Sequence, residues 1–168
     1  VIKLAAGRYV GNFIINHKIT LISQDIHNKA IIDADGKGHA LTLKDSDITI
    51  AQLVIVNWGD NLTTQDAGIF AVVNAKNLTI KANDLRGDGF GMWLQKALHL
   101  TIINTPCREI SHYDQPIVVM AFNSRVSKTP SCVTTTYLKP ETAFISFQAK
   151  ITLSMAIQCM IYVTAFII

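Results

Sequence analysis

The chain has 168 residues, of which 49% are hydrophobic and 16% are charged, and its formal net charge is +3. This length and apolar content suit one domain with a hydrophobic core and argue against intrinsic disorder. The 15 basic residues are spread along the chain rather than clustered. The charge pattern therefore indicates no nucleic-acid partner.

The composition changes abruptly near residues 104–106. All nine glycines lie between Gly7 and Gly91, whereas all four prolines and all three cysteines follow residue 105. Most of the aspartates also precede residue 89. We therefore expect two segments of different origin, a folded segment 1–104 and a non-homologous segment 105–168.

A short strand pattern recurs in the first segment. An apolar residue, a threonine and another apolar residue follow one another four times, at intervals of roughly 20–30 residues, and this alternation is typical of a β-strand. A second short strand is predicted ahead of three of them, where a small residue precedes a large apolar one. The four tripeptides begin at Ile19, Ile48, Leu78 and Leu100, and the three earlier strands at Ala40, Gly68 and Gly91.

Repeats of this length, with short strands and no helical stretch, are typical of a parallel solenoid, in which each turn buries its inward side chains by stacking on the next. The sequence thus predicts an all-β fold for residues 1–104. Glycine- and aspartate-rich stretches between the strands are expected to form the corners. These stretches include Asp33, Asp35-Gly36, Gly38, Asp45-Ser46-Asp47, Asn83-Asp84 and Gly87-Asp88-Gly89.

One insertion, residues 57–66, interrupts the repeat and is expected to project from the solenoid as a loop. Loops on one face of a solenoid often bind ligands, and charged residues on projecting loops are where sites tend to lie. Asp60 and Asp66, with Trp58, are therefore the candidate ligand-binding residues.

Two pairs of carboxylates, Asp33 with Asp35 and Asp45 with Asp47, have the spacing that would let both side chains point the same way on a strand, as a hydrolase or a calcium-dependent lyase needs. Each pair adjoins a turn signal, so a corner role is favoured. We assign no catalytic residue and expect no enzymatic activity. A carbohydrate-binding or polysaccharide-active β-helix is the alternative, and it would need carboxylates clustered on one outer face, among them Asp33, Asp45, Asp60, Asp66 and Asp84.

No metal site is evident in the sequence. Four histidines are far from one another and from any cysteine, and no CxxC motif occurs. Met92 and Trp93 could form an exposed patch, but alternate residues of a solenoid strand usually belong to the core. The stretch 87–91 lacks the spacing of a phosphate-binding loop. These four of the five histidines are His17, His27, His39 and His99.

Two runs of sequence carry a resemblance to a known family. They are NWGDNLTTQDAGIF at residues 57–70 and NLTIKANDLRGDGFGMWL at residues 77–94, and the opening LAAGRYVGNFIINHKITLIS from Leu4 looks like the family's first coil. All three resemble NosD, the accessory proteins of nitrous oxide reductase maturation. The resemblance covers residues 1 to about 104, and the insertion makes it more specific than a general β-helix match.

The resemblance implies a right-handed parallel β-helix of the pectate-lyase type in the periplasm. It also implies two partners, an ABC transporter and nitrous oxide reductase, whose copper-sulfide centre these proteins help to supply. Copper enters only through this resemblance, since no cofactor is evident in the residues themselves. No metal-binding or cofactor-binding residue is carried over. The opening of the chain lacks the features of a secretion signal, so we expect a removed signal or a fragment.

The last residues, 151–168, form an uncharged apolar run after Lys150 that is long enough for a short membrane helix. If this run is genuine, the chain is a membrane-anchored structural domain, which is a second alternative. The run contains many β-branched residues, and codon degeneracy offers another origin for it. When the last base of each codon is joined to the first two of the next, Met155-Ala156 must give Gly and Met160-Ile161 must give Asp.

The remaining junctions of residues 155–168 permit the string GNTMHDLRYGVHY in this offset frame. The same offset permits RDGIYI across residues 140–146 and RGNGIQ across residues 117–123. All three strings resemble NosD segments in the expected order. We therefore expect that a single-frame slip near residue 104 produced the segment 105–168. This segment would then be poorly ordered or an apolar helix, and the chain would be a truncated copy without a function of its own.

Overall fold

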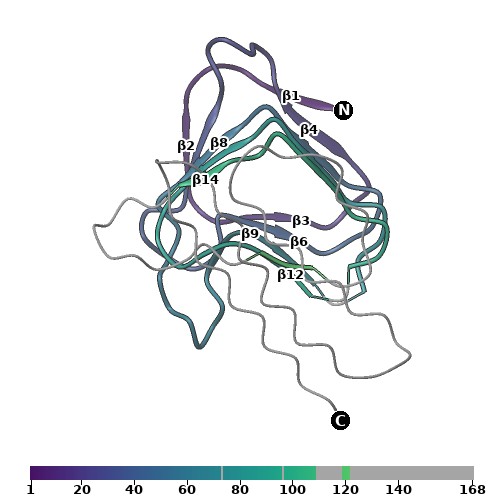
Figure 1. The fold of residues 1–168 in the computed structure, drawn as a ribbon. Coiled ribbons are helices and arrows are strands. Elements are labelled where there is room, and N and C mark those ends of the chain that lie inside the picture. Colours follow the sequence, from purple (N-terminus) through teal and green to yellow (C-terminus); the bar gives the residue numbers. More distant parts are fainter. Residues whose placement is uncertain (73, 96, 109–118, 122–168) are drawn as a thin grey trace, which may run out of the picture.

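The computed structural model describes residues 1–72, 74–95, 97–108 and 119–121. This part of the chain contains β-strands and no helix, and the strands form three five-stranded sheets in which every pairing is parallel. Figure 1 shows the sheets as the three sides of a triangular coil. The predicted parallel β-helix is confirmed.

Each turn of the coil, here called a rung, contributes one strand to each sheet. Sheet A contains β1 (Ile2–Leu4), β4 (Thr20–Ser23), β7 (Thr49–Ala51), β10 (Thr79–Lys81) and β13 (Thr101–Ile103). Sheet B contains β2 (Arg8–Val10), β5 (Ile31–Asp33), β8 (Val54–Val56), β11 (Asp84–Arg86) and β14 (Cys107–Arg108). Sheet C contains β3 (Phe13–Ile15), β6 (Leu41–Leu43), β9 (Ala67–Ala71), β12 (Phe90–Leu94) and β15 (Val119–Ala121).

The recurring tripeptides form sheet A because their side chains stack in register from rung to rung. Ile50 pairs with Ile80, and Ile80 pairs with Ile102. All three are fully buried. The threonines stack in the neighbouring column, and Thr49 is partly exposed. A strand of three or four residues cannot bury its side chains alone, so stacking on the strands of neighbouring rungs stabilises it.

The strands of sheet B were not predicted. Only the middle residue of each faces inward, as with the buried Ile32, Ile55 and Leu85, so no repeated tripeptide marks them. Asp33 and Asp84, assigned to corners from the sequence, instead lie within β5 and β11. That assignment was wrong because aspartate was taken as a turn signal at positions where it occupies a strand end.

Two corners of the coil turn on a single residue at positive φ. Between sheets C and A, the surface corner uses Asp47, Asn77 and His99, whose φ angles are 57°, 54° and 54°. Between sheets A and B, the buried corner uses Gln52, Ala82 and Asn104, and the residue after each is buried. Left-handed backbone costs a non-glycine residue about 1–2 kcal/mol, so packing in the rungs must offset that cost.

The coil continues past the expected boundary at residue 104. Thr105 and Cys107 are buried, and the amide of Leu85 donates to the carbonyl oxygen of Pro106. Residues 109–118 and 122–168, including the expected apolar helix 151–168, lie outside the described part of the chain. Within the described part, no helix is long and apolar enough to cross a membrane.

Candidate functional site

The insertion 57–66 joins β8 to β9 and projects from the triangular outline of the coil (Figure 1). It is held in shape by Asn61. The side chain of Asn61 accepts hydrogen bonds from the amides of Thr63 at 2.9 Å and Thr64 at 3.4 Å, and its carbonyl oxygen accepts from the amide of Asp66 at 3.0 Å. The loop thus closes on its own backbone.

Trp58 lies at the start of this loop but is only 3% exposed. A Cβ added at Gly68 would come within 2.9 Å of the indole ring, and one at Gly87 within 2.8 Å. The ring therefore packs directly against two stretches of backbone that only glycine leaves open. Trp58 does not lie on the exposed face of the loop, and its area contributes to the core.

The two candidate carboxylates of the loop differ in their exposure to solvent. Asp60 is exposed to solvent, whereas Asp66 is 9% exposed and accepts a hydrogen bond from Thr64 Oγ1 at 2.8 Å. A Cβ at Gly59 would collide with Asp66 Oδ2, so the carboxylate is seated against the glycine backbone. The structure does not bring Asp60, Asp66 and Trp58 together on one open surface.

His39 lies near Asp66 although the two are far apart in sequence. Its ring stacks on Phe70, with the centroids 4.1 Å apart and the planes 16° from parallel. Burial lowers the pKa of His39 below its usual value, and the negative charge of Asp66 opposes this shift only in part. The neutral imidazole is therefore favoured near pH 7. No short-range sequence signal links these three residues, so the grouping was missed.

Asp33 is held by a set of structural contacts rather than presented to solvent. Its side chain is 5% exposed, is paired with Arg8, and accepts from the amide of Asp35 at 3.0 Å and from Asn57 Nδ2 at 3.1 Å. Burial by itself would raise the pKa of Asp33, but these hydrogen bonds and the charge of Arg8 outweigh it and lower the pKa. Asp35 is exposed and pairs with Lys37.

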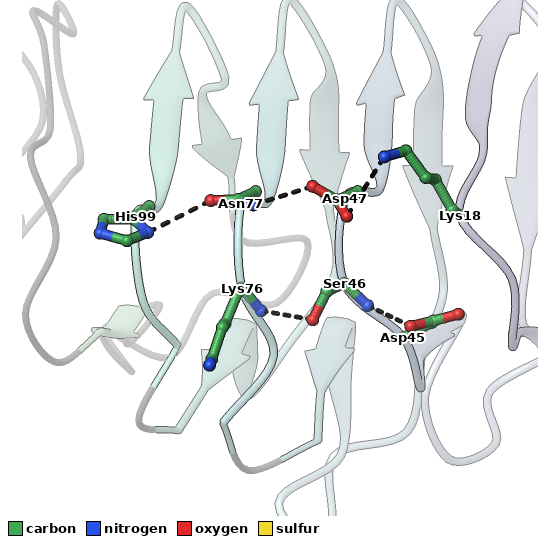
Figure 2. A network of polar contacts seen from close by, with 7 residues as sticks. All are labelled: Lys18, Asp45, Ser46, Asp47, Lys76, Asn77 and His99. Atoms are coloured by element: carbon green, nitrogen blue, oxygen red, sulfur yellow. Dashed lines mark hydrogen bonds and ion pairs between the residues drawn. The ribbon is translucent and has the colours of Figure 1, made fainter.

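Figure 2 shows a polar ladder along the surface corner. Lys18 Nζ lies 3.3 Å from Asp47 Oδ2, Asn77 Nδ2 donates to Asp47 Oδ1 at 2.8 Å, and His99 Nδ1 lies 3.2 Å from Asn77 Oδ1. Because Asn77 directs its amide nitrogen at the carboxylate, its oxygen faces His99. His99 Nδ1 must then carry the hydrogen that it donates. The bonds from Asn77 and Lys18 lower the pKa of Asp47.

A second set of contacts runs beside this ladder (Figure 2). The amide of Lys76 donates to Ser46 Oγ at 3.0 Å, and the amide of Ser46 donates to Asp45 Oδ1 at 2.7 Å. Asp45 thus caps its own corner. Its geometry is that of the corner chemistry expected from the sequence.

Asp84 is 2.6 Å from Arg86 on the outer side of sheet B. The carboxylates proposed for the carbohydrate alternative therefore lie on different elements: Asp33 and Asp84 in sheet B, Asp45 at the surface corner, and Asp60 and Asp66 in the insertion. Within the described ranges, no group of three His, Cys, Asp or Glu residues is placed to hold a metal ion.

The neighbouring residues Met92 and Trp93 face opposite sides of β12. Met92 is fully buried, which confirms its core assignment. Trp93 is partly exposed and meets the edge of Phe90, with 4.8 Å between ring centroids. Cys107 is also buried, and burial, with a smaller effect from the charge of Asp84, raises the pKa of its thiol to about 12. This thiol is unreactive at neutral pH.

Asn83 is a buried polar residue that the sequence did not single out. It is 1% exposed, accepts from the amide of Leu53 at 3.0 Å and donates to the carbonyl oxygen of Ile50 at 3.0 Å. Its own amide donates to Thr105 Oγ1 at 3.4 Å. Leu53 occupies the same corner position one rung earlier. Aligning the two rungs places Asn83 at the position of this buried leucine, and this alignment could have predicted that Asn83 lies inside the coil.

Comparison with known proteins gives several relatives with one name. A protein of Pseudomonas aeruginosa named "Probable ABC transporter binding protein NosD" is 42% identical over 102 residues, which is 61% of this chain and 23% of that protein. The N-terminal segment of this chain is NosD-like. The matched length is close to the 104 residues expected to form the solenoid. No family model matches the chain.

Two further NosD proteins agree with this result. One, of Stutzerimonas stutzeri, is 29% identical over 101 residues, or 60% of this chain and 22% of its own length. A second from Pseudomonas aeruginosa is 35% identical over 66 residues, or 39% of this chain and 58% of its own length. The chain thus spans less than a quarter of the first two relatives, both of which are named "Probable ABC transporter binding protein NosD".

Proposed function

We propose that this chain is a truncated copy of a NosD-like accessory protein, whose intact form works in the periplasm with an ABC transporter and assists copper-centre assembly in nitrous oxide reductase. The observation that carries the proposal is the 42% identity over 102 residues to a protein named as an ABC transporter binding protein. The coil of stacked rungs supports it, because a solenoid offers extended surfaces for protein partners.

The placement of the carboxylates supports a binding role over catalysis. Glycoside hydrolysis needs two carboxylates facing each other across a substrate, roughly 5–10 Å apart. Here Asp33 is engaged by Arg8 and Asn57 at the end of β5, and Asp47 by Asn77 and Lys18 at the surface corner. We therefore propose that the intact protein is not an enzyme.

We further propose that a frame slip near residue 104 produced the segment 105–168, so that the copy has no activity of its own. Thr105 and Cys107 are buried in the last rung, so the frame slip should be sought in the codons from 104 to 109. On this account, the three cysteines and the apolar terminus are products of the wrong frame. A metal, disulfide or membrane role should not be built on them.

A complementation experiment tests the functional part of the proposal. The gene would be restored to the offset frame after residue 104 and expressed in a denitrifying bacterium that lacks its own NosD. We expect the restored gene to recover the copper content and the activity of nitrous oxide reductase, and the unrepaired chain to recover neither. Failure of the restored gene, when its product is folded and exported, would contradict the proposed role.

A further inference from the structure

His39 lies between two hydrogen bonds that hold the ends of the insertion. Just before it, the carbonyl oxygen of Gly38 accepts from the amide of Gly59 at 3.0 Å, and just after it the amide of Ala40 donates to the carbonyl oxygen of Ala67 at 3.1 Å. The first bond holds the start of the insertion, and the second holds the residue that follows its end. A short segment of the second rung therefore holds both ends of a loop that belongs to the third.

The surroundings of the His39 ring suit the neutral imidazole. The ring stacks on Phe70, and its Nδ1 atom is buried without a hydrogen-bond partner among the described residues. A buried nitrogen lone pair without a partner costs less than a buried N–H of a charged ring, because the charge also loses its hydration. We therefore expect the hydrogen of the neutral ring on Nε2. Protonation of Nδ1 would place a positive charge where no acceptor meets it.

Asp66 is a charged group that acts on His39 from the end of the insertion. Its carboxylate accepts from Thr64 Oγ1 at 2.8 Å and lies against the backbone of Gly59, so it helps to close the loop. The negative charge of Asp66 favours a protonated His39. Burial of the ring has the larger effect and keeps the pKa of His39 below its usual value of 6.5.

Other charged groups lie on the elements around this corner. Asp35 and Lys37 precede His39 in the same segment, and they pair with each other at 2.9 Å. Asp60 is exposed in the insertion, and Asp88 lies at the corresponding corner of the fourth rung. Within the described residues, burial and the carboxylate at the end of the insertion are what shift the pKa of this histidine.

We propose that His39 is an acid-sensitive switch of the insertion: neutral His39 keeps residues 57–66 against the coil, and protonated His39 releases them. The charged ring leaves its stack on Phe70 for solvent, and the hydrogen bonds of Gly59 and Ala40 beside it weaken. Because burial lowers the pKa of His39, its contribution to the closed loop is fully present above pH 6.5 and is lost as the pH falls through the lower pKa of the closed form. The switch does not depend on the proposed function.

Amide hydrogen exchange of the full chain at about pH 7.5 and about pH 5 tests the switch. After correction for the intrinsic exchange rates, protection of the Gly59 and Ala40 amides should fall by about tenfold at the lower pH, since one proton is coupled to opening. The amide of Thr79, which donates to the carbonyl oxygen of Ile48, is the internal control and should keep its protection. Equal protection of Gly59 and Ala40 at both pH values, or higher protection at the lower one, would overturn the proposal.

A substitution of His39 separates it from other groups that titrate. His39→Phe keeps an aromatic ring beside Phe70 but cannot be protonated, so the insertion should stay protected at both pH values. His17→Phe, the same change at an exposed histidine, is the matched control and should respond to acid like the unmodified chain. A folded His39→Phe chain that still loses protection at the lower pH would overturn the proposal.

If His39→Phe fails to fold, Asp66→Asn still decides the question. This change keeps an oxygen that can accept from Thr64 but removes the charge that favours protonated His39. The midpoint of the loss of protection should therefore move to lower pH. An acid response abolished by Asp66→Asn would assign the switch to the carboxylate instead, and an unmoved midpoint would show that His39 is not the titrating group. Either result would overturn the proposal.

Discussion

The buried corner and the surface corner turn the coil with the same backbone conformation, one residue at positive φ, in three successive turns each. At the surface corner, Asp47, Asn77 and His99 bond to one another in solvent. At the buried corner, Asn83 bonds to the backbone of the preceding rung inside the core. An exposed polar group that loses its hydrogen-bond partner can bond to water instead, whereas a buried group that loses its partner stays unsatisfied. We therefore expect the two corners to differ in energy although they look alike in geometry.

The largest expected effect comes from Asn83→Leu. Leu53 shows that leucine fits this corner, so the change removes hydrogen bonds with little steric cost. It leaves the buried amide of Leu53 without its acceptor and removes the bond from Asn83 to the carbonyl oxygen of Ile50, which should lower the free energy of unfolding by about 3 kcal/mol. Chemical denaturation measures this loss. An unchanged midpoint would show that the buried corner does not stabilise the coil.

Lowering the pH should reduce the stability contributed by the buried carboxylate of Asp33 more than that contributed by the exposed carboxylate of Asp47. The pKa of Asp33 is lowered in the folded state, so its contribution is fully present above the unfolded pKa, near 3.8, and is lost as the pH falls through the folded pKa. Asp33→Asn should therefore make unfolding less dependent on pH below about 4, at some cost in stability at neutral pH. Asp47→Asn is the exposed control, with a smaller change. Equal pH profiles for all three chains would contradict this account.

Asn77→Ala tests the surface corner. The substitution removes two solvent-exposed hydrogen bonds and leaves alanine at a φ of 54°. We expect a loss of about 1 kcal/mol, most of it from the backbone conformation that asparagine tolerates better than alanine. Asn77→Gly removes the same bonds without that strain. If Asn77→Gly is as damaging as Asn83→Leu, the distinction between the corners is wrong.

Much of the fold could be predicted from the sequence, because the inward-facing columns of sheets A and C carry apolar side chains in successive rungs. Ile48, Leu78 and Leu100 are each followed by threonine and then an apolar residue, and the rungs stack these positions in register. Sheet B was missed because a three-residue strand needs only one inward side chain. Its flanking residues, such as Asp33 and Asp84, are free to serve outer-face contacts and so resemble turns.

Less of the candidate site could be predicted. Charge and position in a loop indicated Asp60, which is exposed, but gave no warning that Trp58 would be covered. That burial depends on Gly68, in the same rung, and on Gly87, in the next rung, which leave space for the indole ring. Contacts across rungs are set by stacking register, and register is not visible in any one stretch of sequence.

Ala82→Gly probes the backbone of the buried corner alone. Ala82 has a φ of 55°, and glycine adopts that conformation without steric cost. The gain is partly offset by the greater entropy of glycine in the unfolded chain, so we expect a net stabilisation of about 0.5 kcal/mol. Thermal unfolding would show it as a small rise in Tm. A fall in Tm would mean that the Ala82 methyl group contributes more packing than its position indicates.

The smallest expected effect is that of Lys18→Ala. Lys18 and Asp47 are 75% and 39% exposed, and their 3.3 Å contact is screened by salt. The change should fall within the error of chemical denaturation at physiological salt. A loss that persists at 1 M salt would show that the surface ladder acts as more than a solvated ion pair.

Resequencing the coding DNA, with several hundred bases beyond the last codon, tests the central claim most directly. Our account predicts that the frame offset by one base after about codon 104 encodes further NosD-like rungs in an unbroken order. A DNA sequence with no NosD-like translation in that frame would contradict it. Residues 105–168 would then be a genuine part of the protein, and the membrane-anchored alternative would take precedence.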